Sequence, residues 1–265
     1  MEKYINEIIC GENVEVLRGF PGGSIDLTVT SPPYDNLRTY NGFKWDFESL
    51  AQELFRVTKD GGVVVWVVND ATVNGSETGT SFRQALFFKE MGFRLHDTML
   101  FLKRNPIPNT EKTRYQQQFE YMFVFSKGRP ETVNLIMKDK SPGTLKRQQH
   151  SNLKLYRQAD GSFDGIRYDE IKTTKTKLTN VWEYLVGFNA QNDKLASEHP
   201  AVFPEKLAED HIISWSNPGD IIFDPFVGSG TTAKMAALND RHYIGIDISE
   251  EYCELARRRV SEAIT

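Results

Sequence analysis

The strand count at the C-terminal end of the chain is the strongest constraint on its fold. The apolar, β-branched run Ile221–Phe223 leads into a glycine turn, Asp224–Thr232, and a second short strand, Tyr243–Ile246, follows. Each of these strands precedes a helical segment, and the 265-residue chain then ends. A nucleotide-binding half of a doubly wound sheet needs a third strand. The apolar run Ile8–Cys10 can supply that strand, so we expect the two ends of the chain to lie side by side.

The rest of the chain alternates strand-like and helix-like segments, which is typical of α/β proteins. Val63–Val68 is apolar without alternation, as expected of a strand that is buried on both faces. The pattern predicts a doubly wound, mostly parallel sheet. Its expected strands are 221–223, 243–246, 8–10, 25–30, 63–68, 93–102 and 121–125, and helices are expected at 47–57, 81–91, 201–215, 231–238 and 251–263.

The strand and helix pattern fails between about residues 127 and 180. This stretch holds twelve Lys/Arg and six Asp/Glu, a balance of +6, so the remainder of a chain with net charge -4 sums to -10. A basic segment on an acidic body can face phosphates, although it can also be a solvated surface loop. The segment is therefore either an inserted recognition region or a long ordered loop.

Composition excludes several classes of site. The two cysteines, Cys10 and Cys253, form no CxxC pair, so neither a zinc site nor a disulfide framework is expected. No cluster of His, Cys and carboxylates indicates a metal. The first residues lack a basic-then-apolar signal, and the longest apolar run is too short to cross a bilayer. We expect no membrane association and a reducing, cytoplasmic compartment.

The glycine turn can approach a ligand closely. Gly228-Ser229-Gly230 allows a tight reversal from strand to helix, and Thr231 can cap the helix that follows. Asp224 can bind a cationic amino group or order the turn. Asp247, which ends the next strand, can bind the hydroxyls of a ribose. Residues 228–233 also fit the nicotinamide pattern G-x-G-x-x-A, so the turn alone leaves nicotinamide and adenosyl cofactors open.

A second motif, Thr30-Ser31-Pro32-Pro33-Tyr34, follows the β-branched run Ile25–Thr30. Two prolines fix the direction of the chain, so the hydroxyl of Ser31 and the carbonyl of Pro32 can both accept from an amino group. The ring of Tyr34 can stack on a planar heterocycle that has left the DNA helix. Alone, the motif fits an ordinary Pro-Pro turn. Together with the glycine turn it favours methyl transfer from S-adenosylmethionine to a base amine.

Read in order, these motifs resemble those of the β-class DNA amino-methyltransferases of restriction-modification systems. Thr30–Tyr34 resembles the catalytic motif of that family, and Asp224–Thr232 resembles its cofactor motif. Further similarity lies in the ribose-binding strand Tyr243–Asp247, in His199–Pro204, which resembles the HPAxFP segment that helps cover the cofactor, and in Glu120–Lys127, which resembles the last strand of the catalytic half.

The resemblance implies a Rossmann-like methyltransferase fold with circularly permuted motif order. It implies three parts: a catalytic half over 1–126, a target-recognition region over 127–190 and a cofactor-binding half over 191–265. Either Glu12 or Asn13 takes the place of an aspartate that faces the cofactor adenine in many members. The implied catalytic residues are Ser31, Pro32, Pro33 and Tyr34, and the implied cofactor-binding residues are Glu12, Asn13, His199, Phe203, Asp224, Phe226, Gly228, Ser229, Gly230, Thr231, Thr232, Asp247 and Ile248.

Serine at the first motif position is typical of members that methylate N4 of cytosine, whereas aspartate or asparagine is typical of N6-adenine enzymes. We therefore expect N4 of a flipped cytosine in double-stranded DNA as the target, with N6-adenine as the alternative. Methylation of cytosine C5 is disfavoured because neither Cys10 nor Cys253 follows a proline. A nicotinamide-dependent oxidoreductase would leave Ser31–Tyr34 without a role, and RNA or protein-amide methylation stays open.

The same resemblance bears on partners. It implies a prokaryotic or phage-type enzyme that works as a monomer or homodimer, with a cognate restriction endonuclease as a further partner.

Overall fold

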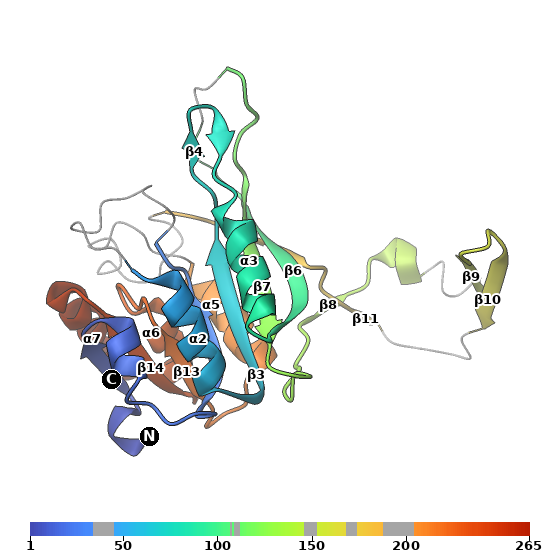
Figure 1. Ribbon diagram of the computed structural model, residues 1–265. Helices are drawn as coiled ribbons and strands as arrows, with labels where there is room; N and C mark the ends of the chain where they lie inside the picture. The colour runs from blue at the N-terminus through green and yellow to red at the C-terminus, as the bar shows by residue number, and fades with distance from the viewer. Residues whose placement is uncertain (34–44, 107, 109–111, 146–152, 168–173, 188–203) are drawn as a thin grey trace. The chain divides into compact units, whose positions relative to one another are not determined.

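The computed structural model describes residues 1–33, 45–106, 108, 112–145, 153–167, 174–187 and 204–265 (Figure 1). The chain divides into two compact units. The larger unit combines Met1–Asn134 with Asn180–Thr265, and the smaller one is Leu135–Thr179. The α/β architecture expected from the sequence belongs to the larger unit.

An eight-stranded sheet forms the centre of the larger unit, and both ends of the chain contribute to it. Its strands pair in parallel from β1 to β3, whereas β7 runs antiparallel to both of its neighbours. In spatial order the strands are β1 (Glu7–Cys10), β14 (His242–Asp247), β13 (Ile221–Asp224), β2 (Ile25–Thr30), β3 (Thr58–Val68), β7 (Phe119–Ser126), β6 (Arg94–Lys103) and β12 (Val181–Tyr184).

The expected closure of the sheet by the two chain ends is confirmed. β1 pairs in parallel with β14, with Ile9 opposite Ile246, although the two strands lie at opposite ends of the sequence. All seven expected strands are present. The sequence analysis missed the eighth strand, β12, which pairs in parallel with the outer edge of β6.

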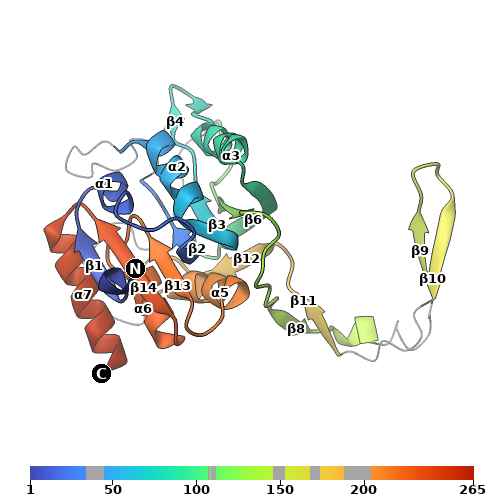
Figure 2. The ribbon, with the colours of Figure 1, turned by 60° about the horizontal axis from the view of Figure 1, so that its bottom comes forward.

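Helices cover both faces of the sheet (Figures 1 and 2). α1, α2 and α3 lie on one face, and α5, α6 and α7 lie on the other. The 3-10 helix η1 spans Glu2–Tyr4, and the α-helices are α1 (Asn13–Leu17), α2 (Phe47–Val57), α3 (Thr80–Glu90), α5 (Glu205–Trp215), α6 (Thr231–Leu238) and α7 (Glu250–Ile264).

The core explains why the central strand β3 contains an unbroken apolar run. Every side chain of Val63–Val68 is buried because helices pack on both sides of β3. α2 begins where the side chain of Asp46 accepts a hydrogen bond from the amide of Ser49, and it buries Leu50 and Leu54 against the sheet. The helix expected over 201–215 begins at Glu205 in the structure, and residues 201–203 lie outside the described part.

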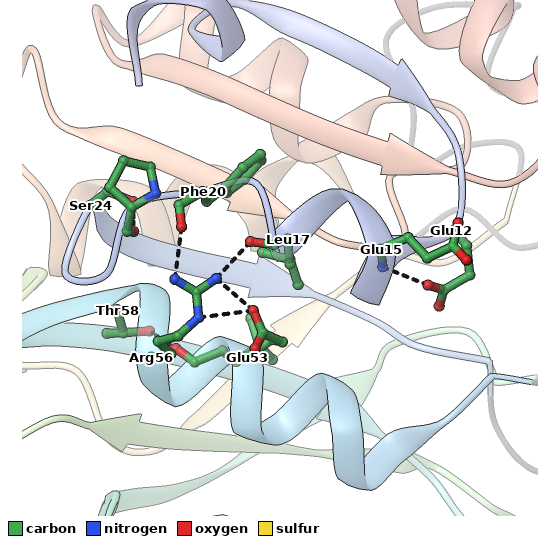
Figure 3. A network of polar contacts seen from close by, with 10 residues as sticks. Glu12, Glu15, Leu17, Phe20, Ser24, Glu53, Arg56 and Thr58 are labelled. Carbon is green, nitrogen blue, oxygen red and sulfur yellow. Dashed lines mark hydrogen bonds and ion pairs between the residues drawn. The ribbon is translucent and has the colours of Figure 1, made fainter.

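One arginine fixes the short helix α1 against α2 (Figure 3). The guanidinium of Arg56 donates to the main-chain oxygens of Leu17 and Phe20, each at 2.7 Å, and pairs with Glu53. Cationic donors satisfy the free carbonyls at a helix C-terminus well. α1 is therefore held at its far end, and its first residue, Asn13, lies near the candidate active site.

The smaller unit contains two short antiparallel pairs. β8 (Met137–Asp139) pairs with β11 (Lys175–Lys177), and β9 (Leu153–Arg157) pairs with β10 (Phe163–Arg167). The larger unit has one further hairpin, formed by β4 (Thr72–Val73) and β5 (Ser76–Glu77). The division of the chain into functional parts at residues 127 and 190 stays a prediction.

Candidate active site

The candidate site lies where the direction of the sheet reverses. From β13 the chain continues through α6 to β14 on one side, and from β2 it continues through α2 to β3 on the other side. Neighbouring strands whose connections diverge in this way open a crevice at their carboxyl ends, where α/β proteins bind ligands. The glycine turn follows β13 and the Ser-Pro-Pro motif follows β2, so the structure brings both sequence motifs to this edge.

Two hydrogen bonds join the motifs directly. Thr30 Oγ1 donates to Asp224 Oδ1 at 2.6 Å, and both residues are buried. Thr232 Oγ1, at the start of α6, donates to the main-chain oxygen of Val29 at 3.1 Å. The last residues of β2 are therefore fixed to both ends of the turn segment 224–232.

The described part of the catalytic motif stands at the end of β2. Pro32 is buried, while Ser31 and Pro33 are partly exposed at the edge of the sheet. Tyr34 lies outside the described residues. Ser31 immediately follows Thr30, so the hydrogen bond to Asp224 limits where its hydroxyl can lie relative to the glycine turn.

The turn after β13 requires glycine at two positions. Gly228 has φ of 49° and Gly230 has φ of 84°, a backbone conformation that L side chains rarely adopt. A Cβ on Gly230 would also lie 2.8 Å from Cβ of Ala256 on α7. The prediction that Thr231 caps α6 is wrong. Gly230 occupies the cap position without a side-chain bond, and Thr231 is the first residue of the helix.

Asp224 orders the turn, which is one of the two roles expected for it. Its Oδ1 accepts from the amide of Phe226 at 3.0 Å as well as from Thr30. Burial raises the pKa of the Asp224 carboxyl to about 6, although these donors oppose the shift. The ring of Phe226 packs edge-on against Trp45, with 5.0 Å between centroids, so the turn has an aromatic wall.

Asp247 closes the turn from the neighbouring strand. Its Oδ2 accepts from the amide of Gly228 at 3.0 Å, and its Oδ1 accepts from the amide of Ser249 at 2.9 Å. Burial raises the pKa of this carboxyl. Each oxygen retains lone-pair capacity for a further donor such as a ribose hydroxyl. The next side chain, Ile248, is 43% exposed and offers an apolar surface at the same edge.

The structure separates the roles of the two candidates on α1. Glu12 caps the helix, since its side chain accepts from the amide of Glu15 at 2.7 Å (Figure 3). Asn13 is buried, and its Nδ2 donates to the main-chain oxygen of Pro225 at 3.4 Å. Asn13 Oδ1 has no hydrogen-bond partner within the described part of the chain. A buried acceptor at this edge suits an amino donor of a bound ligand.

Sequence reasoning missed three buried charged residues behind the turn. Arg259 on α7 donates to the main-chain oxygen of Ser229 at 2.6 Å, to Ser229 Oγ at 2.9 Å and to Thr231 Oγ1 at 3.3 Å. Glu205, at the start of α5, accepts from both Lys234 at 2.7 Å and Arg259 at 3.1 Å. The spacing of Arg259 in the sequence could have indicated its burial, because it follows Ala256 by three residues on the buried face of α7.

Three further expectations concern His199 and Phe203, metal binding and membrane-spanning helices. His199 and Phe203 lie outside the described residues. Within the described residues, no group of three or more His, Cys, Asp or Glu side chains could hold a metal ion. A search of the same residues finds no helix with the length and apolar character needed to cross a membrane.

The donors and acceptors at this edge fit an adenosyl cofactor. A glycine turn that lets the main chain approach a ligand closely, a carboxylate at the end of the adjacent strand and the buried acceptor Asn13 Oδ1 are brought together by three different segments. The same edge carries Ser31 and Pro32. The nicotinamide alternative has no comparable explanation for the Ser-Pro-Pro motif.

Comparison with known proteins agrees with this reading. Residues 25–258 match the family described as DNA methylase, of the N6/N4 type. The chain is 56% identical over 244 residues to the orphan methyltransferase M.BamHII of Bacillus amyloliquefaciens, covering 91% of this chain and 90% of the relative.

Two solved structures share the fold. The PvuII DNA methyltransferase, described as cytosine-N4-specific, matches with a TM-score of 0.69 and 21% identity, over 97% of this chain and 90% of that one. A DNA modification methylase of Thermus thermophilus, TTHA0409, complexed with S-adenosyl-L-methionine, matches with a TM-score of 0.65 and 22% identity, over 98% and 96% of the two chains. The chain therefore belongs to the N6/N4 DNA methylase family and is a DNA methyltransferase of the Rossmann-like α/β type.

Proposed function

We propose that this chain transfers a methyl group from S-adenosylmethionine to the exocyclic N4 of a flipped cytosine in double-stranded DNA. The observation that carries the proposal is the 2.6 Å hydrogen bond between Thr30 and Asp224. It ties the strand that ends in Ser31-Pro32-Pro33 to the strand that ends in the glycine turn. A base amine at the first motif and a methyl donor at the second would thus share one edge.

The glycine turn, Asp247 and Asn13 are the proposed cofactor-binding residues, together with Phe226, Ile248 and Thr232. When bound, S-adenosylmethionine supplies an electrophilic methyl group. Two similar structures support this cofactor, because one is described as a complex with S-adenosyl-L-methionine and the M1.HpyAVI structure as a SAM complex. His199 and Phe203, which lie outside the described residues, are proposed to cover the cofactor.

Ser31 and Pro32 are the proposed acceptors for the target amine. The lone pair of an exocyclic base nitrogen is delocalised into the ring, so the amine is a weak nucleophile. Hydrogen bonds from its two N–H groups to Ser31 Oγ and Pro32 O favour a pyramidal nitrogen with a free lone pair. The new N–C bond would form as the bond between the methyl carbon and the cofactor sulfur breaks, with S-adenosylhomocysteine as the leaving group. The oxygens of Ser31 and Pro32 would stabilise the positive nitrogen, and one proton would leave to water. Tyr34 is proposed to stack on the base.

Serine at the first motif position supports cytosine N4 over adenine N6. The fold relative described as cytosine-N4-specific supports the same choice. N6-adenine is the alternative, because both bases present the same amino group to Ser31 and Pro32.

The proposal extends to partners. The smaller unit Leu135–Thr179, within the 127–190 segment, is proposed to recognise the target sequence with its lysines and arginines. A relative named an orphan methyltransferase supports a free-standing enzyme, whereas relatives named type II methyltransferases support a cognate endonuclease. Action in a prokaryotic cytoplasm, as a monomer or homodimer, completes the proposal.

Mass spectrometry of nucleosides tests this function. Unmethylated plasmid DNA is incubated with the purified chain and S-adenosylmethionine, then digested to nucleosides. N4-methylcytosine supports the proposal, and N6-methyladenine establishes the alternative. The absence of both, from a protein that binds S-adenosylhomocysteine by calorimetry, would overturn it. The Ser31→Ala variant is the matched control and should bind cofactor with little turnover.

A further inference from the structure

Two exposed segments extend beyond the edge of the sheet that carries Ser31. In the register of β2 and β3, Thr30 lies opposite Trp66, and β3 ends two residues later at Val68. The β4–β5 hairpin, residues 72–77, follows this end. Residues 112–118 belong to the connection between β6 and β7 and lead into the start of β7, opposite Val68 at Tyr121. We call residues 72–77 and 112–118 together the arm (Figure 1).

Polar contacts hold the two segments of the arm to one another and to the sheet. Arg114 Nη1 lies 3.6 Å from Glu77 Oε1, and Arg114 Nη2 donates to the main-chain oxygen of Gly75. Gln117 Nε2 donates to Asn69 Oδ1 at 3.1 Å, just beyond the end of β3. The hairpin closes where the amide of Thr78 donates to Ala71 O at 2.9 Å. The arm is therefore braced at its tip and at its base.

The residues of the arm do not pack into the core of the protein. All six residues of 72–77 are exposed, and Arg114 is the only described residue of 112–118 that is even partly buried. An isolated two-stranded hairpin is marginally stable in water. Tyr115 is 100% exposed, and Val73 is 55% exposed. The arm therefore holds the ring of Tyr115 in solvent, where it is accessible to a partner.

The charge of the arm fits a nucleic acid. Lys112 and Arg114 outweigh Glu77 in the arm, whereas the chain outside residues 127–180 is acidic. A base that is flipped toward Ser31 leaves a gap in the duplex next to this edge. Aromatic side chains stack readily on bases exposed in this way.

We propose that the arm contacts the DNA duplex beside the target base and that Tyr115 stacks on a neighbouring base. This inference rests on the proposed function, and it assigns DNA binding to the larger unit as well as to the smaller unit Leu135–Thr179. Tyr115 would then stabilise the opened duplex without touching the cofactor.

Kinetics with two variants of Tyr115 test the proposal. With unmethylated plasmid DNA and tritiated S-adenosylmethionine, Tyr115→Ala should raise the KM for DNA about tenfold or more, as expected for the loss of one stacking contact. Tyr115→Phe keeps the ring and should restore KM to within about threefold of the wild type, by the same stacking argument. Both variants should retain the wild-type Kd for S-adenosylhomocysteine and the wild-type Tm, because the side chain is fully exposed.

Three outcomes decide the matter. A KM for Tyr115→Ala that equals the wild-type value overturns the proposal. An equal loss in Tyr115→Phe overturns the stacking role, because the hydroxyl would then carry the effect. If the wild type binds S-adenosylhomocysteine and methylates no DNA, the proposed function fails separately. The arm is then tested by fluorescence anisotropy with a labelled duplex, on which Tyr115→Ala must bind more weakly than the wild type for the proposal to stand.

Discussion

Arg259 Nη1 lies 2.6 Å from the main-chain oxygen of Ser229, so a side chain near the end of the chain holds the centre of the glycine turn. The same guanidinium reaches Glu205, which also pairs with Lys234. All three charged residues are buried. Arginine suits this position because its planar fork can donate to several oxygens at once, whereas a lysine ammonium is a point donor.

We therefore expect Arg259→Lys to weaken cofactor binding more than it weakens the fold. Loss of the forked contacts to Ser229 should raise the Kd for S-adenosylhomocysteine about fivefold to tenfold, the range expected for about one hydrogen bond. Lys234→Met is the matched control, since Lys234 pairs with the same carboxylate, Glu205, at 2.7 Å. It should lower the Tm and leave the Kd near the wild-type value. Calorimetric titration of both variants measures the difference, and equal Kd values for the two would contradict the role of Arg259.

The glycine turn offers a second comparison. Gly230 and Gly219 have nearly the same φ, 84° and 87°, but a Cβ on Gly230 would lie 2.8 Å from Ala256, whereas a Cβ on Gly219 would meet nothing within 4 Å. Gly219→Ala should lower the free energy of unfolding by about 1 kcal/mol, which is the cost of placing a residue with a Cβ at positive φ. Gly230→Ala should add the steric clash, about 1–3 kcal/mol more, and abolish binding of S-adenosylhomocysteine. Urea denaturation of the two variants gives the comparison, and similar losses would show that the contact with α7 is unimportant.

The sequence predicted the sheet well because buried parallel strands are continuous apolar runs. Val63–Val68, a continuous apolar run, could be recognised without its neighbours, and Ile25–Thr30 could be recognised by its β-branched residues. β12 was missed for the converse reason. Its four residues alternate between exposed and buried, and it lies at the edge of the sheet after a long segment without a pattern. An edge strand of this kind is defined by pairing with β6, which sequence does not display.

The candidate site was predictable only as far as motifs encode it. Ser31 and the glycines were found because they belong to two motifs, Thr30–Tyr34 and Asp224–Thr232, that each follow a predicted strand. The helix cap assigned to Thr231 was wrong, since the αL backbone of Gly230 takes that position. Arg259 was missed because only its spacing of three residues from Ala256 distinguishes it from the two arginines that precede it. Its role depends on packing between α7 and the turn, which arises only in the folded chain.

Two threonines on β2 allow the effect of a hydrogen bond on stability to be measured apart from the effect of burial. Thr30 Oγ1 donates to Asp224, whereas Thr28 Oγ1, equally buried, has no hydrogen-bond partner in the part of the chain that the structure describes. Thr30→Val should lower the free energy of unfolding by about 1.5–3 kcal/mol, since hydrogen bonds to charged groups lie in this range. Thr28→Val should be neutral or stabilising.

The rate of DNA methylation should also fall more in Thr30→Val than in Thr28→Val, because Thr30 directly precedes Ser31 and fixes it relative to the glycine turn. Thr30→Val should reduce kcat for DNA methylation, while Thr28→Val should leave it close to the wild-type value. Thr30→Ser retains the donor and should recover most of the loss. Urea denaturation and steady-state kinetics on the three variants provide the measurement. If Thr28→Val proved as harmful as Thr30→Val, shape rather than the bond to Asp224 would explain both effects.

The raised pKa of Asp224 predicts how stability depends on pH. Burial raises the pKa of this carboxyl in the folded chain to about 6, whereas an aspartate in the unfolded chain titrates near 4. Between these values the folded state binds more protons than the unfolded state, so this group stabilises the fold at low pH and its contribution disappears as pH rises through about 6. Asp224→Asn removes the titration. From pH 5 to pH 7.5 the wild type should therefore lose about 1 kcal/mol relative to Asp224→Asn, measured by urea denaturation at each pH. Parallel pH profiles for the two proteins would mean that Asp224 keeps an ordinary pKa when folded, and the Thr30 and Phe226 donors would then outweigh its burial.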